Sequence, residues 1–161
     1  PQKIIIGGWN GTDFGALMNQ FNNVIWPSLT AHTQNHFVYP VIHQFRSCRE
    51  DASIGLAAAR LNECVFLLEH IVEREKRPQE SKLRPVSRAI QRLLDTLEST
   101  GLPDSGKQAP PPEFSQLSAH GLTHDTPEVN HSGSRDSSRK LAADAGWSWE
   151  SVVGSHDEPL E

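Results

Sequence analysis

Apolar residues recur at intervals of three or four positions in three stretches of the chain, the spacing that gives an α-helix one buried face. The first stretch contains Phe14, Leu17, Met18, Phe21, Val24 and Ile25. Thr12 precedes it, and threonine is a residue type that caps the N-termini of helices. The pattern therefore predicts a helix that begins near Thr12 and extends to Ile25.

Pro27 follows this first predicted helix and lacks a backbone N–H. It is expected either to kink the helix or to begin a second one over residues 29–37. Tyr39-Pro40 then predicts a turn, because a residue that precedes proline disfavours the helical region.

The same spacing predicts two further helices. One covers residues 52–76, and its apolar stripe consists of Leu61, Val65, Leu68, Ile71 and Val72. The other begins near Pro85 and ends before Gly101, and its stripe consists of Val86, Ile90, Leu93, Leu94 and Leu97. No segment shows the convincing alternation of apolar and polar residues typical of a strand, so the sequence predicts an all-α fold, a small helical bundle of three to four helices.

Residues 101–161 have a different composition, rich in Pro, Ser, His and Asp, with 10 acidic residues against 4 basic ones. Such a segment buries too little apolar surface to offset the entropy lost on ordering. We therefore expect a flexible lead over residues 1–11 and a helical domain over residues 12–100. Residues 101–161 are expected to form a linker and a largely disordered acidic tail, with a short Trp-containing element at 146–153.

The net charge of −5 does not indicate a broadly positive surface, so nucleic acid is not an expected partner. No apolar run approaches the roughly 18 residues of a membrane-spanning helix. Cys48 and Cys64 cannot form a disulfide-rich scaffold, and no secretion signal is recognisable. These observations favour a cytoplasmic location and no membrane span within this chain.

Histidines suggest a metal site as one hypothesis. His32 and His36 lie four residues apart on a predicted helix, and His43 is a third candidate ligand. However, the pair lacks the intervening glutamate of a zinc-protease helix, and structural zinc usually takes four protein ligands. Exposed or core-edge imidazoles are therefore the simpler interpretation, and metal binding is kept as an alternative.

Nothing in the sequence assembles a catalytic site or a cofactor site. Cys48 lies between Arg46 and Arg49, which would lower the pKa of its thiol, but no base can be placed beside it. Cys64 falls on a predicted helix and is expected in or near the core. We expect no enzyme and no cofactor, and a hydrolase with a His/Asp or Cys/His site ranks last among the hypotheses.

Trp147 and Trp149 are unusual in such a polar tail. Exposed tryptophans usually have something to pack against. We expect them to dock on the helical domain or on a partner.

The segment from His36 to Ser47 resembles a known signature. Its sequence, His-Phe-Val-Tyr-Pro-Val-Ile-His-Gln-Phe-Arg-Ser, is similar to the His-x-x-Tyr-Pro-x-x-x-x-Phe-Arg-Ser pattern in the cytoplasmic carboxy-terminal region of bacterial two-helix potassium-channel-like proteins. The pore helix, the Gly-Tyr-Gly filter and both membrane helices are absent, and Cys48 stands where the family commonly has glutamine. The resemblance implies a cytosolic helical module without a pore, and it carries over no ligand residues.

A structural role explains this motif without any chemistry. Tyr39-Pro40 would form a sharp turn, Phe45 would anchor that turn in the core, and Arg46 would bond to carbonyls at a helix end. The functional alternative is a contact surface of His36, Tyr39, His43 and Arg46 that senses pH or binds an acidic ligand.

The sequence therefore predicts a non-catalytic cytosolic helical module that acts through protein-protein contacts. Its partner is expected to be another protein or a second copy, and a membrane-embedded channel part is one candidate. In that case the module would lie at the inner face of the membrane. The alternative is a small metal- or ligand-binding helical protein that depends on histidine.

Overall fold

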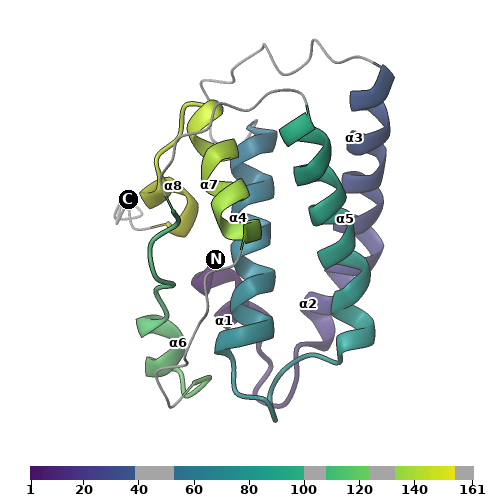
Figure 1. Cartoon of the computed structure of the whole chain (residues 1–161). Helices are drawn as coiled ribbons and strands as arrows, with labels where there is room; N and C mark the ends of the chain where they lie inside the picture. The colour runs from purple at the N-terminus through teal and green to yellow at the C-terminus, as the bar shows by residue number, and fades with distance from the viewer. Residues whose placement is uncertain (39–52, 100–107, 124–132, 155–161) are drawn as a thin grey trace, which may run out of the picture.

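The computed structural model describes residues 1–38, 53–99, 108–123 and 133–154 (Figure 1), and for residues 32, 35–38 and 97–98 it describes the backbone alone. Within these ranges the secondary structure is helical and contains no strand. The all-α prediction is therefore confirmed.

The longest helical run comprises α2 (Gly15–Gln20), η1 (Phe21–Ile25) and α3 (Trp26–Val38). A second run comprises α4 (Ile54–Phe66) and η4 (Leu67–Ile71), and α5 (Glu80–Ser99) follows. Figure 1 shows α3, α5 and α4 side by side, and α5 contacts both of the others. These elements form the bundle that the apolar periodicity predicts.

Pro27 does not begin a new helix: the helical run continues through it, with a distortion in the turn before it. The turn before it, η1, is a π-helix in which the N–H of Trp26 donates to the carbonyl of Phe21, five residues back. A proline in a helix lacks its own N–H and crowds the carbonyl four residues earlier. A wider turn at this point accommodates the proline while the helix continues.

Two helices have boundaries that differ from the prediction. The helix expected over residues 52–76 begins after Ser53, whose Oγ accepts the N–H of Leu56 at 3.3 Å, and it ends at Ile71. The helix expected from Pro85 is α5, and it begins at Glu80, five residues earlier. The start at Ser53 can be recognised from the sequence because serine is a common capping residue, whereas the end of the helix at Ile71 depends on packing with the rest of the protein.

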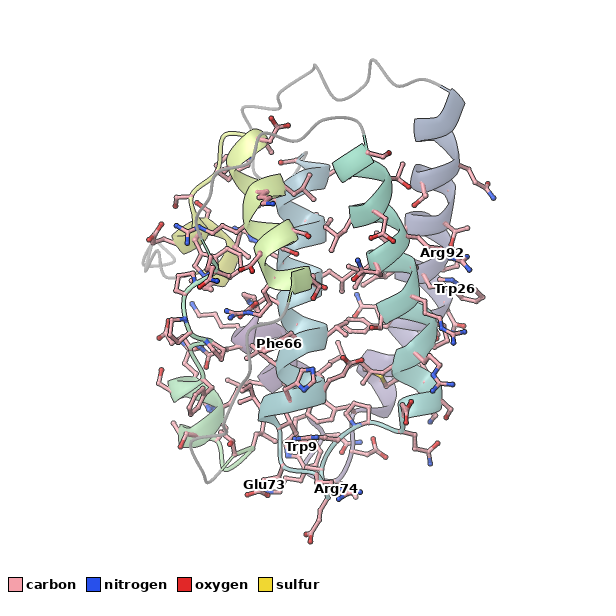
Figure 2. All side chains as sticks on the ribbon, viewed as in Figure 1. Trp9, Trp26, Phe66, Glu73, Arg74 and Arg92 are labelled. Carbon is pink, nitrogen blue, oxygen red and sulfur yellow. The ribbon has the colours of Figure 1, made fainter. Side chains whose placement is uncertain are left out.

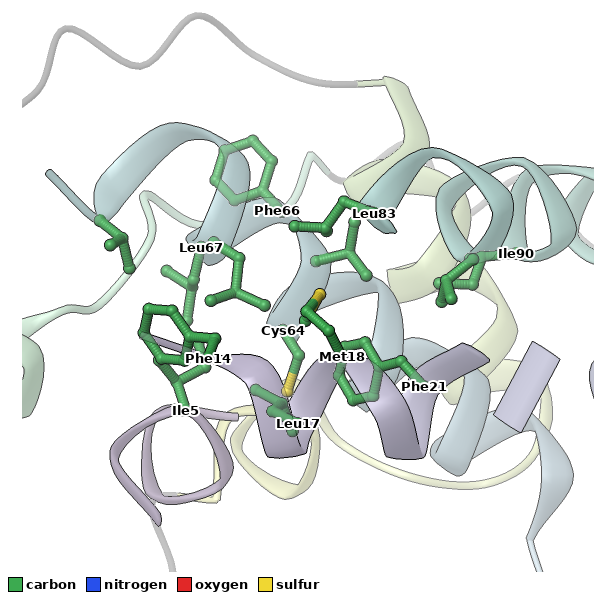
Figure 3. Packing of buried hydrophobic residues seen from close by; sticks show 14 of the residues in the cluster. Ile5, Phe14, Leu17, Met18, Phe21, Cys64, Phe66, Leu67, Leu83 and Ile90 are labelled. Carbon is green, nitrogen blue, oxygen red and sulfur yellow. The ribbon is translucent and has the colours of Figure 1, made fainter. Parts of the chain in front are cut away.

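The main core lies where α1, α2, α4 and α5 meet (Figure 3). Its largest fully buried side chains are Ile5, Phe14, Met18, Phe21, Leu67, Leu68, Ile90, Leu93, Leu94, Leu117 and Leu122. Ile5, Leu117 and Leu122 lie outside residues 12–100, so segments before and after the predicted domain complete this core.

The amino-terminal residues differ from the expected flexible lead. They form α1 (Gln2–Gly8), in which Ile5 is fully buried. The Gln2 Oε1 accepts the N–H groups of Gln116 at 3.0 Å and Leu117 at 3.3 Å, and both donors belong to α6 (Ser115–Ala119). Burial of the Ile5 side chain and of the Gln2 amide therefore holds this segment. Two such contacts do not produce the apolar periodicity by which a helix is recognised in a sequence.

Part of the described tail differs from expectation. Helix α7 (Gly133–Asp144) was not expected, whereas α8 (Trp149–Val153) falls within the short Trp-containing element expected at 146–153, and both pack on α4. A second cluster of buried side chains joins them and consists of Leu56, Ala59, Ala109, Ala142, Trp149 and Val152. Helix α4 lies before the domain boundary expected at residue 100 and α7 lies after it, so their contacts cross that boundary. Independent folding of residues 12–100 stays a prediction.

Candidate functional site

An apolar groove of about 770 Å³ runs between α1, the α2–η1–α3 run and α4. Buried core residues form its floor, among them Leu17, Phe21 and Cys64, which Figure 3 shows packed together. Its volume lies in the range of sites that bind ligands or the anchoring side chains of a partner.

Large apolar side chains stand exposed along this groove. Ile4, Val24 and Ile54 are 48%, 58% and 39% exposed, and all three line it. Trp26 is the other exposed large hydrophobic residue among the described positions, and it lies on a different face of α3. Apolar side chains concentrated around one hollow are typical of contact sites, whereas isolated ones are common on any surface.

Small residues open the groove on its α1 side. Gly7 lines it, and a Cβ added there would meet no atom within 4 Å. A Cβ at Gly8, in contrast, would lie 2.8 Å from the Cβ of Leu17. Gly8 therefore lets α1 pack closely on α2, and Gly7 leaves space over the groove.

The charged side chains of the groove are cationic. Lys3 and Arg60 line it, and no Asp or Glu is among the described residues that do. Arg60 donates from Nε and Nη2 to the carbonyl of Ser151 at 3.0 Å and 2.8 Å, which fixes its guanidinium beside α8. The groove thus combines an apolar floor with positive charge at its edges.

Cys64 lies at the bottom of the groove and is not suited to nucleophilic chemistry. Its side chain is fully buried, and its Sγ donates to the carbonyl of Pro1 at 3.6 Å. Burial raises the pKa of this thiol from its ordinary 9.0 to about 11. At neutral pH it behaves as a core side chain, as expected from its position on the helix.

The structure places Trp149 against α4. Its side chain is 8% exposed and belongs to the cluster with Leu56 and Val152. Trp147 is partly buried against the same cluster, and its Nε1 has no hydrogen-bond partner among the described residues. Docking of these tryptophans on a separate partner stays a prediction.

The other sequence candidates are not brought together by the described residues. His32 and His36 lie on α3, where the description covers the backbone alone. Tyr39, Pro40, His43, Phe45, Arg46 and Cys48 lie outside the described residues. Both the structural-corner interpretation and the histidine hypothesis therefore stay predictions. In the described part of the chain, no group of three or more His, Cys, Asp or Glu side chains is arranged to hold a metal ion.

Sequence reasoning did not find the groove. Ile4 and Ile5 lie in the segment expected to be a flexible lead, and only the fold shows that Ile5 faces the core and Ile4 the groove. Val24 and Ile25 counted as core positions in the periodicity, yet Val24 is the most exposed of the large hydrophobic residues described. The π-turn changes the helical register at this point, and a search at 3.6 residues per turn misses that change.

Comparison with known proteins gives one distant relative. No family model matches the chain, and no solved structure matches it. The uncharacterised membrane protein YdjJ of Bacillus subtilis is 25% identical over 121 residues. The match covers 74% of this chain and 35% of that protein, so the chain spans about a third of its relative's length. Among the described helices, none has the length and apolar character needed to cross a membrane.

Proposed function

We propose that this chain is a non-catalytic helical module that binds an amphipathic helix of a protein partner in the groove between α1, α2 and α4. The observation that supports this most directly is the exposure of Ile4, Val24 and Ile54 around one apolar hollow. Grooves of this kind accept the apolar face of a helix through anchors at positions i, i+3, i+4 and i+7. Gly7, which has no side chain, leaves room for the backbone of a partner helix to approach α1.

The partner helix carries acidic residues beside its apolar stripe. This choice follows from Lys3 at the edge of the groove, together with the lack of acidic residues among its described lining. Opposite charge across an interface steers association and selects the partner. A second copy docked groove to groove would bring the two cationic edges together, which is less favourable.

The relative supports placing this module beside a membrane-embedded part. YdjJ is described as a membrane protein and is about three times as long as the aligned region. We propose that the module belongs to a protein of this kind and works at the cytoplasmic side of the membrane. The similarity of residues 36–47 to potassium-channel-like proteins adds the narrower proposal of a channel-like context, and it rests on sequence alone.

Binding of model helices tests the proposal. The probe is a labelled synthetic helix of about five turns with leucines along one stripe and glutamates on both sides of it. Controls are the same peptide with lysines in place of the glutamates and a peptide of identical composition with scrambled leucines. We expect saturable binding of the glutamate peptide by fluorescence anisotropy and weaker binding of both controls.

A matched pair of variants locates the binding site. Val24→Asp places a charge at the exposed edge of the groove and is expected to weaken binding about tenfold or more. Ala143→Asp makes a comparable change at an exposed position on α7 and is expected to leave binding unchanged. Equal binding of the scrambled peptide, or no effect of Val24→Asp, contradicts the proposal. So does a dimer of the chain alone that Val24→Asp converts to monomer, because the groove would then hold a second copy.

A further inference from the structure

A second groove, of about 520 Å³, lies between α3 and α5, on a face of α3 different from that of the apolar groove. Its lining includes Trp26, Thr30 and Thr33 from α3 and Arg84, Arg88 and Arg92 from α5. No Asp or Glu is among the described residues that line it. The groove is therefore cationic along one wall and uncharged along the other.

The three arginines form a stripe along α5. They are spaced four residues apart, and no other charged residue occurs between Arg84 and Arg92. At 1.5 Å rise per residue the stripe extends over about 12 Å. The facing helix α3 contains no Asp, Glu, Lys or Arg, so the arginines supply the charge of the groove's described lining.

The guanidinium groups of this stripe are available to an external anion. Arg84 donates from Nη2 to the Oε1 of Glu80 at 2.7 Å, but both side chains are more than half exposed, so water screens the pair strongly. Within the described ranges, Arg88 and Arg92 have no acidic partner.

The threonines of the groove offer no competing donors. The hydroxyls of Thr30 and Thr33 already donate to the carbonyls of Trp26 and Leu29, each at 2.9 Å. Uncharged donors remain on Gln34, Ser81 and Trp26, and the charged donors of the described lining are those of the arginines. Their planar guanidinium groups match the oxygen spacing of a phosphate.

Trp26 adds an apolar contact beside this charge. Its side chain is 44% exposed, and Figure 2 shows it next to Arg92 at the side of the molecule formed by α3 and α5. An indole combines an apolar ring with an N–H donor, and tryptophan is enriched where membrane and water meet.

We propose that the groove between α3 and α5 binds the phosphate headgroups of anionic phospholipids, with Trp26 inserted at headgroup level. A soluble phosphate would contact one or two exposed arginines in water and gain little. A lipid surface presents many phosphates at once, so the whole arginine stripe and Trp26 can engage together. The contact is peripheral and needs no spanning segment in this chain.

Vesicle binding of the full chain tests this proposal. The vesicles contain phosphatidylglycerol and phosphatidylcholine in equal parts, and the comparison vesicles contain phosphatidylcholine alone. We expect co-sedimentation with the anionic vesicles, decreasing as salt is added. Arg88→Gln and Arg92→Gln are each expected to weaken binding about fivefold, and the double variant about 25-fold. Trp26→Ala is expected to weaken it as well.

Arg74→Gln is the matched control. Arg74 is also an exposed arginine, but Figure 2 shows it at the lower end of the bundle, away from Arg92. Its substitution is expected to leave binding unchanged, and thermal melting checks that each variant keeps its fold. The proposal is overturned by equal binding to both vesicle types, or by an effect of Arg74→Gln equal to that of Arg92→Gln. Displacement from the vesicles by soluble glycerol phosphate at equal phosphate concentration would also overturn it, because a free phosphate would then be the ligand.

Discussion

Arg135 of α7 and Glu63 of α4 form an ion pair with two hydrogen bonds in the interior of the protein. The Arg135 Nε donates to Glu63 Oε2 at 2.8 Å, and the Nη2 donates to Oε1 at 2.9 Å. The side chains are 4% and 2% exposed. The Arg135 Nη1 also donates to the carbonyl of Pro110 at 2.8 Å, and the guanidinium lies over the rings of Phe66 and Trp149. One arginine thus connects α4 with three segments of the tail.

Substitution Glu63→Gln is expected to lower the free energy of unfolding by about 3–5 kcal/mol, because it leaves the Arg135 charge buried without a counter-ion. Urea unfolding followed by circular dichroism measures this loss. The control is the double variant Glu63→Met with Arg135→Met, which removes both charges and is expected to lose less than the single variant. A loss below about 1 kcal/mol for Glu63→Gln would contradict a tightly buried pair.

Substitution Trp149→Ala is expected to destabilise the protein by about 3–5 kcal/mol, since it empties the centre of the cluster between α4 and α8. Trp26→Ala serves as the control: this tryptophan is 44% exposed, and its loss is expected to cost about 1 kcal/mol or less. Thermal unfolding of both variants compares them. Equal losses would mean that the tail does not depend on Trp149 for its packing.

The adjacent glycines of α1 are expected to respond in opposite ways to alanine. Gly8→Ala places a methyl group 2.8 Å from the Cβ of Leu17 and should destabilise the protein by about 1–3 kcal/mol. Gly7→Ala meets open space and should be neutral or stabilising by up to about 1 kcal/mol, because alanine favours a helix. Denaturant midpoints of the two variants decide this, and a similar loss in both would contradict the close packing of α1 on α2.

The pKa of the Cys64 thiol predicts a fall in stability at alkaline pH. Burial holds the thiol neutral in the folded protein up to about pH 11, whereas the unfolded thiol ionises near 9.0. The stabilisation is therefore complete below pH 9 and is lost as the pH rises towards 11, amounting to about 2–3 kcal/mol. Urea unfolding at pH 8 and near pH 10.5 measures it. Other groups also titrate in this pH range, so the test compares the fall in unfolding free energy of the parent with that of Cys64→Ala. An equal fall in both proteins would exclude the thiol as the cause.

Apolar periodicity predicted the bundle because its signal is local. Residues near Leu17, Val65 and Ile90 repeat at helical spacing, and that repeat determines the buried face of each helix. The ends of the helices depend on less regular features, such as the cap at Ser53. The end at Ile71 also required the tertiary contacts of the following residues.

Apart from the Trp-containing element, the packing of the tail was not predicted, because few apolar residues hold it. In α7 the buried apolar positions are Leu141 and Ala142, and Arg135 is buried only because Glu63, 72 residues away, neutralises it. Composition counts arginine as a surface residue and cannot identify such a partner. The grooves were missed for a related reason: each is formed by helices far apart in the sequence, and none of its residues is unusual by itself.

The π-turn of η1 also sets the phase of the longest helical run. Leu17, Phe21, Ile25 and Leu29 follow one another at steps of four residues, and an ideal α-helix would rotate each step by about 40° away from the last. The wider turn offsets part of this drift, so side chains before and after it continue to face the same core. A π-turn holds one residue more than an α-turn, so deletion of one residue within residues 21–25 is expected to leave a regular α-helix in which α3, Trp26 included, keeps its direction. The same deletion elsewhere in the run would turn everything after it by about 100°.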